Sequence, residues 1–276
     1  MVLIWLLFVL LDMPTCRAEE SALRTAEGVG LDTQVPEGKR LSVDLFSIFY
    51  GPSFKNPTSH LPNADGRPDP NRTVGLRNFL SLGYQLSPEV AVSGTAFWTM
   101  EPYSNTKVAL QDPFVKVSDS SLWREGGWNL YGDLRTHFGM TPSSRESDLL
   151  FALQSVQGLS YEFAETGWVL GVYGSEKSNV FGKYGVGYDL ELYVAPHIHY
   201  AVSPTLMLSL LYEVRLSHLF GDPVGELTSG GTDLEPGVTW NLSPSLMLNP
   251  YLTLNTTGKL SLSTTTFGLM LNWNLL

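Results

Sequence analysis

The sequence predicts an all-β fold, a single antiparallel up-and-down transmembrane β-barrel of about twelve strands, within a range of about ten to fourteen. The chain has 276 residues, of which 43% are apolar and only 16% charged, with a mean hydropathy of +0.01. In soluble proteins about a quarter of the residues are charged. After the opening segment no run reaches the roughly 18 apolar residues of a membrane helix. A barrel reconciles these observations, because its apolar residues occupy alternate positions.

The first 18 residues are predicted to be a signal peptide. An apolar stretch, Val2–Leu11, precedes Cys16-Arg17-Ala18, a small-residue cleavage site, and we expect cleavage after Ala18. A lipid anchor on Cys16 is the alternative, but the preceding residues match a lipoprotein box poorly. Since Cys16 is the only cysteine of the chain, the mature protein is expected to hold neither a disulfide nor a thiolate metal site.

Residues 19–39 are predicted to form a periplasmic N-terminal extension. They are polar, contain several glycines and prolines, and show no sustained period. A disordered tail and a plug of the barrel both remain open for this segment. The barrel itself is assigned to residues 40–276.

From Leu41 onward the hydropathy alternates with a period of two, which is typical of strands with one polar face. Val90–Met100 and Leu206–Leu216 are the clearest examples. The predicted strands are 41–50, 73–86, 89–100, 107–118, 128–138, 148–160, 167–175, 187–202, 205–217, 231–242, 245–256 and 260–275.

A short repeat predicts the topology. Leu86–Glu89, Val202–Thr205 and Leu242–Ser245 each contain Ser-Pro between two alternating runs and are predicted to be tight turns. Outer-membrane barrels keep short turns on the periplasmic side, so both termini are expected there. The longest connections are then expected outside, namely Gly51–Thr73, Glu176–Tyr188 and His218–Gly230.

The final strand carries a resemblance. Phe267, Leu269, Leu271, Trp273 and Leu275 form one apolar face close to the C-terminus, although the chain ends one residue later, on Leu276. In this pattern the chain resembles Gram-negative outer-membrane β-barrels of the porin-like kind, without the signature of a particular family. The resemblance implies a multi-pass barrel in the Gram-negative outer membrane. Several tryptophans lie on the outward, apolar face of the predicted strands, which is typical of the aromatic girdles that contact outer-membrane lipid.

In each predicted strand the apolar residues at alternate positions face outward, and the residues between them are predicted to line the lumen. Charges there must be paired or hydrated. An acid-rich aqueous channel and a plugged lumen of mutual ion pairs remain open. The predicted lining consists of Asp44, Arg77, Asp112, Lys116, Asp133, Arg135, His137, Asp189, Glu191, His197, His199, Glu213, Arg215, Asp233 and Glu235.

We expect no enzyme, cofactor or metal. A hydrolase of this class needs a serine close to an oriented histidine, and no histidine has a serine two residues on. His218 and Asp222 resemble the acid–histidine sites of outer-membrane proteases only weakly. His197 and His199 share a face, but two imidazoles without a third ligand are more often polar lining residues.

Four prolines, Pro113, Pro196, Pro236 and Pro250, fall inside predicted strands, each seven residues from a turn. Proline cannot donate to a ladder, so we expect bulges or broken ladder bonds about 18 Å from the periplasmic rim. By parity all four point to lipid or to a neighbouring subunit, and bent faces of this kind could pack into a homo-oligomer.

The predicted function is a small passive channel for hydrophilic solutes, with cation preference from the net charge of −10, which also argues against nucleic acid. The alternative is a non-conducting structural or surface-interaction barrel, homo-oligomeric and enclosing lipid between subunits. An outer-membrane lipase or protease is less favoured.

Overall fold

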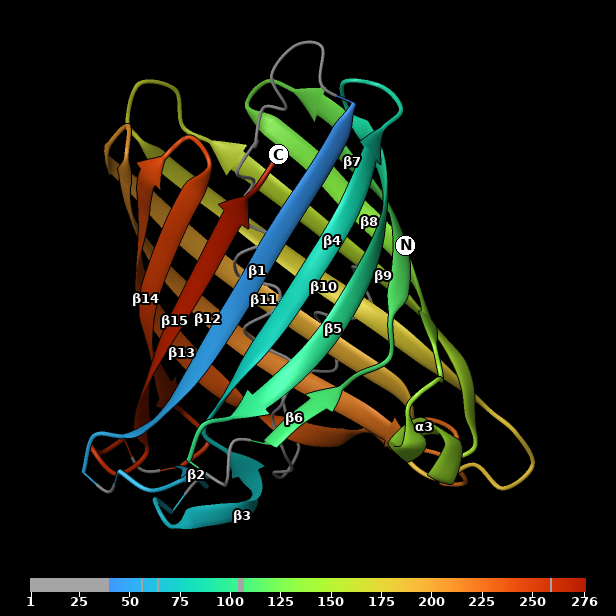
Figure 1. Ribbon diagram of the computed structural model, residues 1–276. Coiled ribbons are helices and arrows are strands. Elements are labelled where there is room, and N and C mark those ends of the chain that lie inside the picture. Colours follow the sequence, from blue (N-terminus) through green and yellow to red (C-terminus); the bar gives the residue numbers. More distant parts are fainter. Residues whose placement is uncertain (1–39, 56, 64, 104–106, 259) are drawn as a thin grey trace.

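The computed structural model describes residues 40–276 except 56, 64, 104–106 and 259, and the predicted signal peptide and N-terminal extension lie outside these residues. The described chain is a closed barrel (Figure 1). Its wall strands are β1 (Leu41–Ser53), β4 (Gly75–Gln85), β5 (Val90–Glu101), β6 (Lys107–Leu110) and β7 (Phe114–Glu125), β8 (Trp128–Phe138), β9 (Leu149–Glu162), β10 (Trp168–Phe181), β11 (Tyr188–Ser203), β12 (Leu206–Leu219), β13 (Thr228–Ser243), β14 (Leu246–Asn255) and β15 (Thr265–Asn274).

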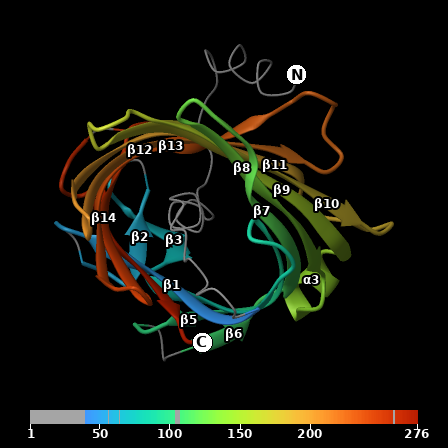
Figure 2. The ribbon, with the colours of Figure 1, turned by 90° about the horizontal axis from the view of Figure 1, so that it is seen from above.

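The barrel closes between its first and last strands. β1 pairs antiparallel with β15 on one side and with β4 on the other, and every other strand pairs with its neighbours in sequence. With β6 and β7 as two pieces of one strand beside β5, the wall has twelve strands, as predicted. Figure 2 shows the resulting ring.

One end of the barrel carries the short connections. This turn end contains residues 86–89, 126–127, 163–167, 204–205 and 244–245. In each predicted Ser-Pro turn the serine hydroxyl accepts from the backbone N–H two residues on, at 3.3 Å for Ser87, Ser203 and Ser243. These bonds occupy backbone donors that the strands leave free, which stabilises the tight turns.

The opposite, loop end carries the long connections. There β2 (His60–Pro62) and β3 (Pro68–Thr73) form a separate hairpin, and a short helix, α3 (Pro142–Glu146), joins β8 to β9 (Figure 1). The alternation did not predict this helix. It begins because Thr141 caps it, accepting from the N–H of Ser144 at 3.2 Å, and because Pro142 suits the first turn.

Several predicted strand boundaries are wrong, among them the end of the strand expected at 107–118, since β7 continues to Glu125. The strand expected at 107–118 is interrupted at Gln111–Pro113, because Pro113 has no N–H to donate. β10 continues to Phe181, which leaves a connection of residues 182–187 where a longer one was expected. β15 begins at Thr265 and not at 260.

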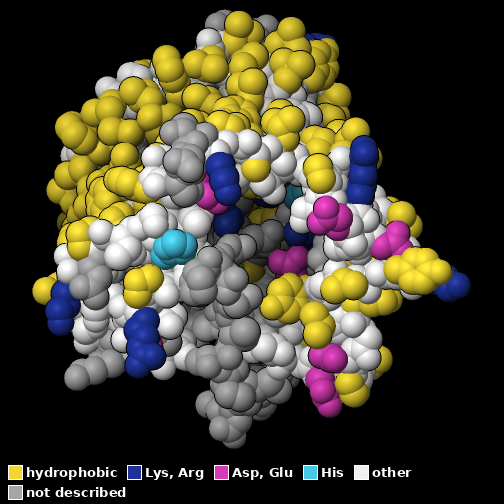
Figure 3. All heavy atoms as spheres, turned by 60° about the horizontal axis from the view of Figure 1, so that its bottom comes forward, with side chains coloured by type: hydrophobic (Ala, Val, Ile, Leu, Met, Phe, Trp, Pro, Cys, Tyr) yellow, Lys and Arg dark blue, Asp and Glu magenta, His cyan; other side chains and the backbone are white. Residues whose placement is uncertain are grey.

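The outer wall is apolar. Trp128, Trp168, Trp240 and Trp273 are all more than two-fifths exposed and lie near the turn end. Figure 3, with the loop end forward, shows apolar side chains over the wall and polar and charged side chains around the rim. Within the described residues, the model has no helix with the length and hydropathy needed to cross a bilayer.

Candidate functional site: the barrel lumen

One side of the lumen is lined by buried charged residues and another side by apolar residues. Its largest group of buried charges lies on β12 and β13, whereas its largest apolar cluster lies on β14, β15, β1, β4 and β7. A barrel of this size has an interior wider than side chains alone just fill at eight strands.

The buried charge cluster is centred on Arg215 of β12. Its guanidinium donates to Glu213 of the same strand and, at 3.0 Å, to Asp233 of β13. The hydroxyl of Tyr193 on β11 donates to the other oxygen of Glu213 at 2.6 Å. Glu213 is fully buried and Arg215 is 7% exposed. Such buried charges are tolerated because each is paired and hydrogen-bonded.

Glu235 lies two residues further along β13 and is satisfied only in part. Thr253 of β14 donates to its Oε1 at 2.8 Å, while Oε2 is buried without a partner. The hydroxyls of Tyr50 and Tyr251 are likewise buried and unpartnered. Arg77 of β4 lies 5.0 Å from the centre of the Tyr50 ring.

Other predicted lining residues form separate local pairs. Arg135 donates to both carboxylate oxygens of Asp133, at 2.6 and 2.7 Å. Glu191 pairs at 3.2 Å with Lys177, a lining residue that the prediction missed because its strand was ended too early. Lys116 stands opposite Arg135 in the ladder and is within electrostatic range of Asp44.

Four histidines lie on the wall strands, and the fifth, His60 of β2, contacts the hydroxyl of Ser59 at 3.1 Å through Nδ1. The rings of His197 and His199 are 4.7 Å apart and buried, and His137 contacts Gln154 at 3.0 Å. His218 contacts Asp189 at 2.6 Å through Nδ1 and the Pro223 carbonyl at 3.1 Å through Nε2. Both nitrogens of this imidazole are thus occupied.

The acid in hydrogen-bond contact with His218 is Asp189, and Asp222, the acid that the sequence suggested, also lies within electrostatic range of His218. Among the residues that the structure describes, no group of three His, Cys, Asp or Glu side chains could hold a metal ion.

Asp112 does not lie on the strand face to which its parity assigned it. It sits in the break between β6 and β7, where strand alternation no longer applies. Its carboxylate accepts from the N–H groups of Met140 and Thr141, both at 2.9 Å, and from the hydroxyl of Ser144. Asp112 therefore holds the β8–β9 connection, a structural role at the loop end.

The prolines face outward but do not bulge the wall. Around Pro196 the ladder to β12 loses pairs between Val194 and His197. Around Pro236 and Pro250 the ladder between β13 and β14 loses pairs as well. In both ladders the register is the same on either side of the gap, so of the two expected outcomes these three prolines show broken ladder bonds and not bulges. Proline lacks the backbone N–H that would donate to the neighbouring strand, so it removes one ladder hydrogen bond, but it does not insert an extra residue into the strand.

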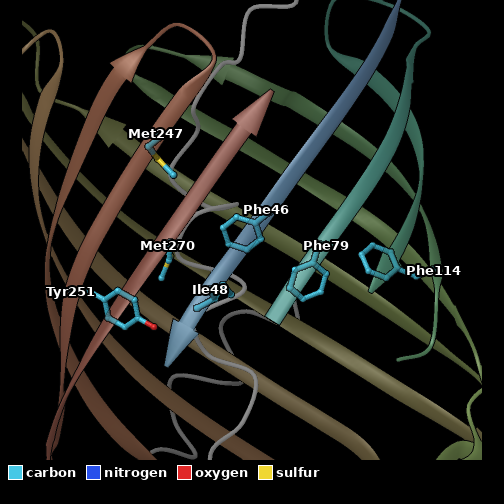
Figure 4. Close-up of a cluster of buried hydrophobic side chains, with 7 residues drawn as sticks. All are labelled: Phe46, Ile48, Phe79, Phe114, Met247, Tyr251 and Met270. Atoms are coloured by element: carbon cyan, nitrogen blue, oxygen red, sulfur yellow. The ribbon is translucent and has the colours of Figure 1, made fainter. Parts of the chain in front are cut away.

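The apolar wall of the lumen was not predicted. Its buried members come from strands far apart in the sequence (Figure 4): Phe46, Ile48, Phe79, Phe114, Met247, Tyr251 and Met270. Tyr50 and Phe97 pack against them, with Phe97 stacked on Phe79 at 4.2 Å between ring centres. One sequence signal was that every residue of Leu45–Tyr50 except Ser47 is apolar, and a run of consecutive apolar residues cannot be assigned to one face by alternation.

Comparison with solved structures adds to this picture. The COG4313 outer membrane channel from Pseudomonas putida F1 superposes with a TM-score of 0.56 at 11% identity, covering 86% of this chain and 96% of that one. The fold is that of an outer-membrane channel. The NanC porin gives a TM-score of 0.50 at 9% identity, covering 84% of this chain and 98% of that one. Neither the protein-family models nor the curated proteins contain a match.

Proposed function

We propose that the chain is a Gram-negative outer-membrane channel through which small hydrophilic solutes diffuse passively. In this proposal the signal peptide is removed after Ala18, the turn end and both termini face the periplasm, and the apolar outer wall contacts outer-membrane lipid. The proposal includes no catalytic step, since His218 has no free ring nitrogen for a nucleophile.

The observation that supports the proposal is the closed barrel, which shares its fold with the COG4313 outer membrane channel and has charged side chains on its inward face. Those charges form three groups on the charged side: Asp133 with Arg135, Lys177 with Glu191, and the cluster around Arg215. The last group is the most deeply buried. There Glu213, Asp233 and Glu235 face Arg215 and Arg77, a formal excess of one negative charge. We therefore expect cations to pass preferentially.

Single-channel conductance tests the channel. Refolded protein from Glu19 to Leu276 is inserted into planar bilayers under a salt gradient. Discrete ohmic steps with a cation-biased reversal potential are expected. The bias should decrease in Glu191→Gln, which removes a lumenal charge, and should persist in Glu226→Gln, which removes a charge from the exposed β12–β13 loop. Silent insertion of protein that shows the heat-modifiable gel mobility of a folded barrel would overturn the proposal.

A second candidate, a homo-oligomeric structural barrel, is favoured by one feature of the outer wall. Glu176 of β10 and Gln157 of β9 point outward and are exposed, next to Ser155, to which Gln157 donates at 2.8 Å. Polar side chains on a lipid face are costly, and a second copy of the chain could supply their partners. In this second candidate lipid is enclosed between the copies.

Disulfide crosslinking tests this second candidate. The mature chain has no cysteine, so Gln157→Cys introduces a single thiol into the polar patch. Rapid dimer formation in membranes is expected for Gln157→Cys and not for Leu170→Cys, an outward position that is 51% exposed on the same wall. Equal crosslinking at both positions would reject the patch as an interface.

A further inference from the structure

His218 lies at the loop end of β12, next to the β12–β13 loop, residues 220–227. Its Nδ1 is 2.6 Å from Oδ1 of Asp189 on β11, and its Nε2 is 3.1 Å from the carbonyl oxygen of Pro223. The imidazole ring therefore joins a wall strand to the β12–β13 loop.

Both partners of the ring are hydrogen-bond acceptors. An ionised carboxylate and a backbone carbonyl have no hydrogen to donate. A neutral imidazole has one N–H group and one acceptor nitrogen, whereas the protonated ring has two N–H groups. Both hydrogen bonds of His218 are therefore formed together only when the ring is protonated.

A β-bulge brings Asp189 to the ring. Leu190 stands opposite His218 and Tyr188 stands opposite Leu219, so that β11 has one residue, Asp189, more than β12 between these pairs. In a regular strand Asp189 would point to the face opposite to that of Leu190 and His218. Bulges redirect side chains and are common beside functional sites. The bulge thus provides a contact that strand alternation would exclude.

The charged groups around the ring are acidic. Asp189 approaches from β11 and Asp222 from the β12–β13 loop, and both interact electrostatically with His218. Glu226 is the other acid of this loop. The residues of β13 that pair with β12 next to His218 are uncharged. Nearby negative charges favour the protonated form of an imidazole.

His218 attaches the middle of the β12–β13 loop to the wall. Within the part of the chain that the structure describes, no other side chain forms a hydrogen bond to residues 221–227. The backbone bonds of this segment are local, as from the N–H of Glu226 to the carbonyl of Pro223 at 3.1 Å. Residues 221–226 are all exposed. The position of the loop therefore depends on the bond from His218 to Pro223.

Loss of the ring proton breaks one of the two bonds. The bond to Asp189 is charge-assisted, and such bonds are about twice as strong as bonds between neutral groups. Nδ1 therefore keeps its hydrogen. The lone pair of Nε2 then faces the lone pairs of the Pro223 carbonyl, and this contact becomes repulsive.

We propose that protonated His218 holds the β12–β13 loop against the loop end of the barrel and that the loop is released when the ring loses its proton. The loop then responds to the pH on the side of the membrane that the loop end faces. The proposal does not depend on conduction, so a silent barrel would keep the same response.

Electron paramagnetic resonance of a nitroxide label on the loop tests the proposal. In refolded protein from Glu19 to Leu276, Val224→Cys introduces the only thiol, because the single cysteine of the sequence is Cys16. Val224 is fully exposed, so the label displaces no packed group. We expect restricted label motion at about pH 5.5 and faster motion at about pH 9, on either side of the range in which histidine titrates.

Two variants in the Val224→Cys background identify the group that titrates. His218→Gln should abolish the transition, because an amide keeps the same donors at every pH. Asp189→Asn removes the closest negative charge and should move the midpoint of the transition to lower pH by about one unit or more. The matched control is His60→Gln on the β2–β3 hairpin at the same end of the barrel, which should leave the midpoint unchanged.

A second label position distinguishes the β12–β13 loop from the rest of the loop end. A nitroxide on Met140→Cys, which is exposed in the β8–β9 connection, should show no transition over the same pH range. Heat-modifiable mobility confirms that each variant is folded. Label motion at residue 224 that is independent of pH would overturn the proposal. A transition that persists in folded His218→Gln would overturn it as well, since another group would then be responsible.

Discussion

The ring of Tyr251 on β14 lies over Gly268 on β15, so that a Cβ added at residue 268 would overlap its Cζ. The glycine leaves space for the tyrosine to lie along the wall. Tyr131 over Gly158 and His197 over Gly171 repeat the arrangement. In each case a large inward side chain covers the bare backbone of the neighbouring strand, which stabilises glycine in a sheet.

Gly268→Ala is therefore expected to destabilise the barrel, because the methyl group displaces the Tyr251 ring. Overpacking of this kind costs about 1–3 kcal/mol. The measurement is the free energy of unfolding in urea, followed by tryptophan fluorescence in detergent or lipid. Gly94→Ala is the control, since a Cβ there meets no atom within 4 Å. Equal effects of both substitutions would contradict the packing explanation.

Substitution of Arg215, the cation at the centre of the buried charge cluster, should lower the free energy of unfolding more than Gly268→Ala does. Arg215→Met leaves Glu213 and Asp233 buried without their guanidinium. Breaking a buried pair from one side costs about 3–5 kcal/mol. We expect a large fall in unfolding free energy in the same urea titration.

The matched control for that variant is Arg67→Met, which removes an arginine from an exposed pair with Asp65, where the side chains are 83% and 56% exposed. No measurable change is expected there. A small effect of Arg215→Met would mean that water reaches the cluster and solvates the two acids.

Local periodicity predicted the strand number and the turns, because alternation and Ser-Pro signals are set within a few residues. It could not predict which charges pair, since the Asp189–His218 contact depends on the register of two strands and on a bulge at their ends. The prediction from periodicity also placed the apolar residues of each strand on the outer face of the barrel. It therefore missed that Phe46 and Phe79 lie in the lumen.

Asp112→Ala is expected to release the β8–β9 connection, because the carboxylate accepts from Met140, Thr141 and Ser144 together. Loss of these bonds should speed proteolytic cleavage within residues 140–147, while the unfolding free energy of the barrel changes little. Limited proteolysis with mass-spectrometric mapping measures this. Asp222→Ala, an exposed loop variant, serves as the control. Unchanged cleavage in Asp112→Ala would show that α3 is held by other contacts.

Pro250 interrupts the ladder between β13 and β14 without shifting its register. Because the register between β13 and β14 is the same on both sides of Pro250, that residue stands opposite Val238 without an inserted residue. Pro250→Ala should restore an N–H aimed at β13, and the new amide should exchange slowly with deuterium. The restored hydrogen bond adds about 1 kcal/mol and loss of the proline's restriction of the unfolded chain removes about 0.4–1 kcal/mol, so stability should change little. A bulge would instead leave the amide unpaired, and rapid exchange at residue 250 would then reveal it.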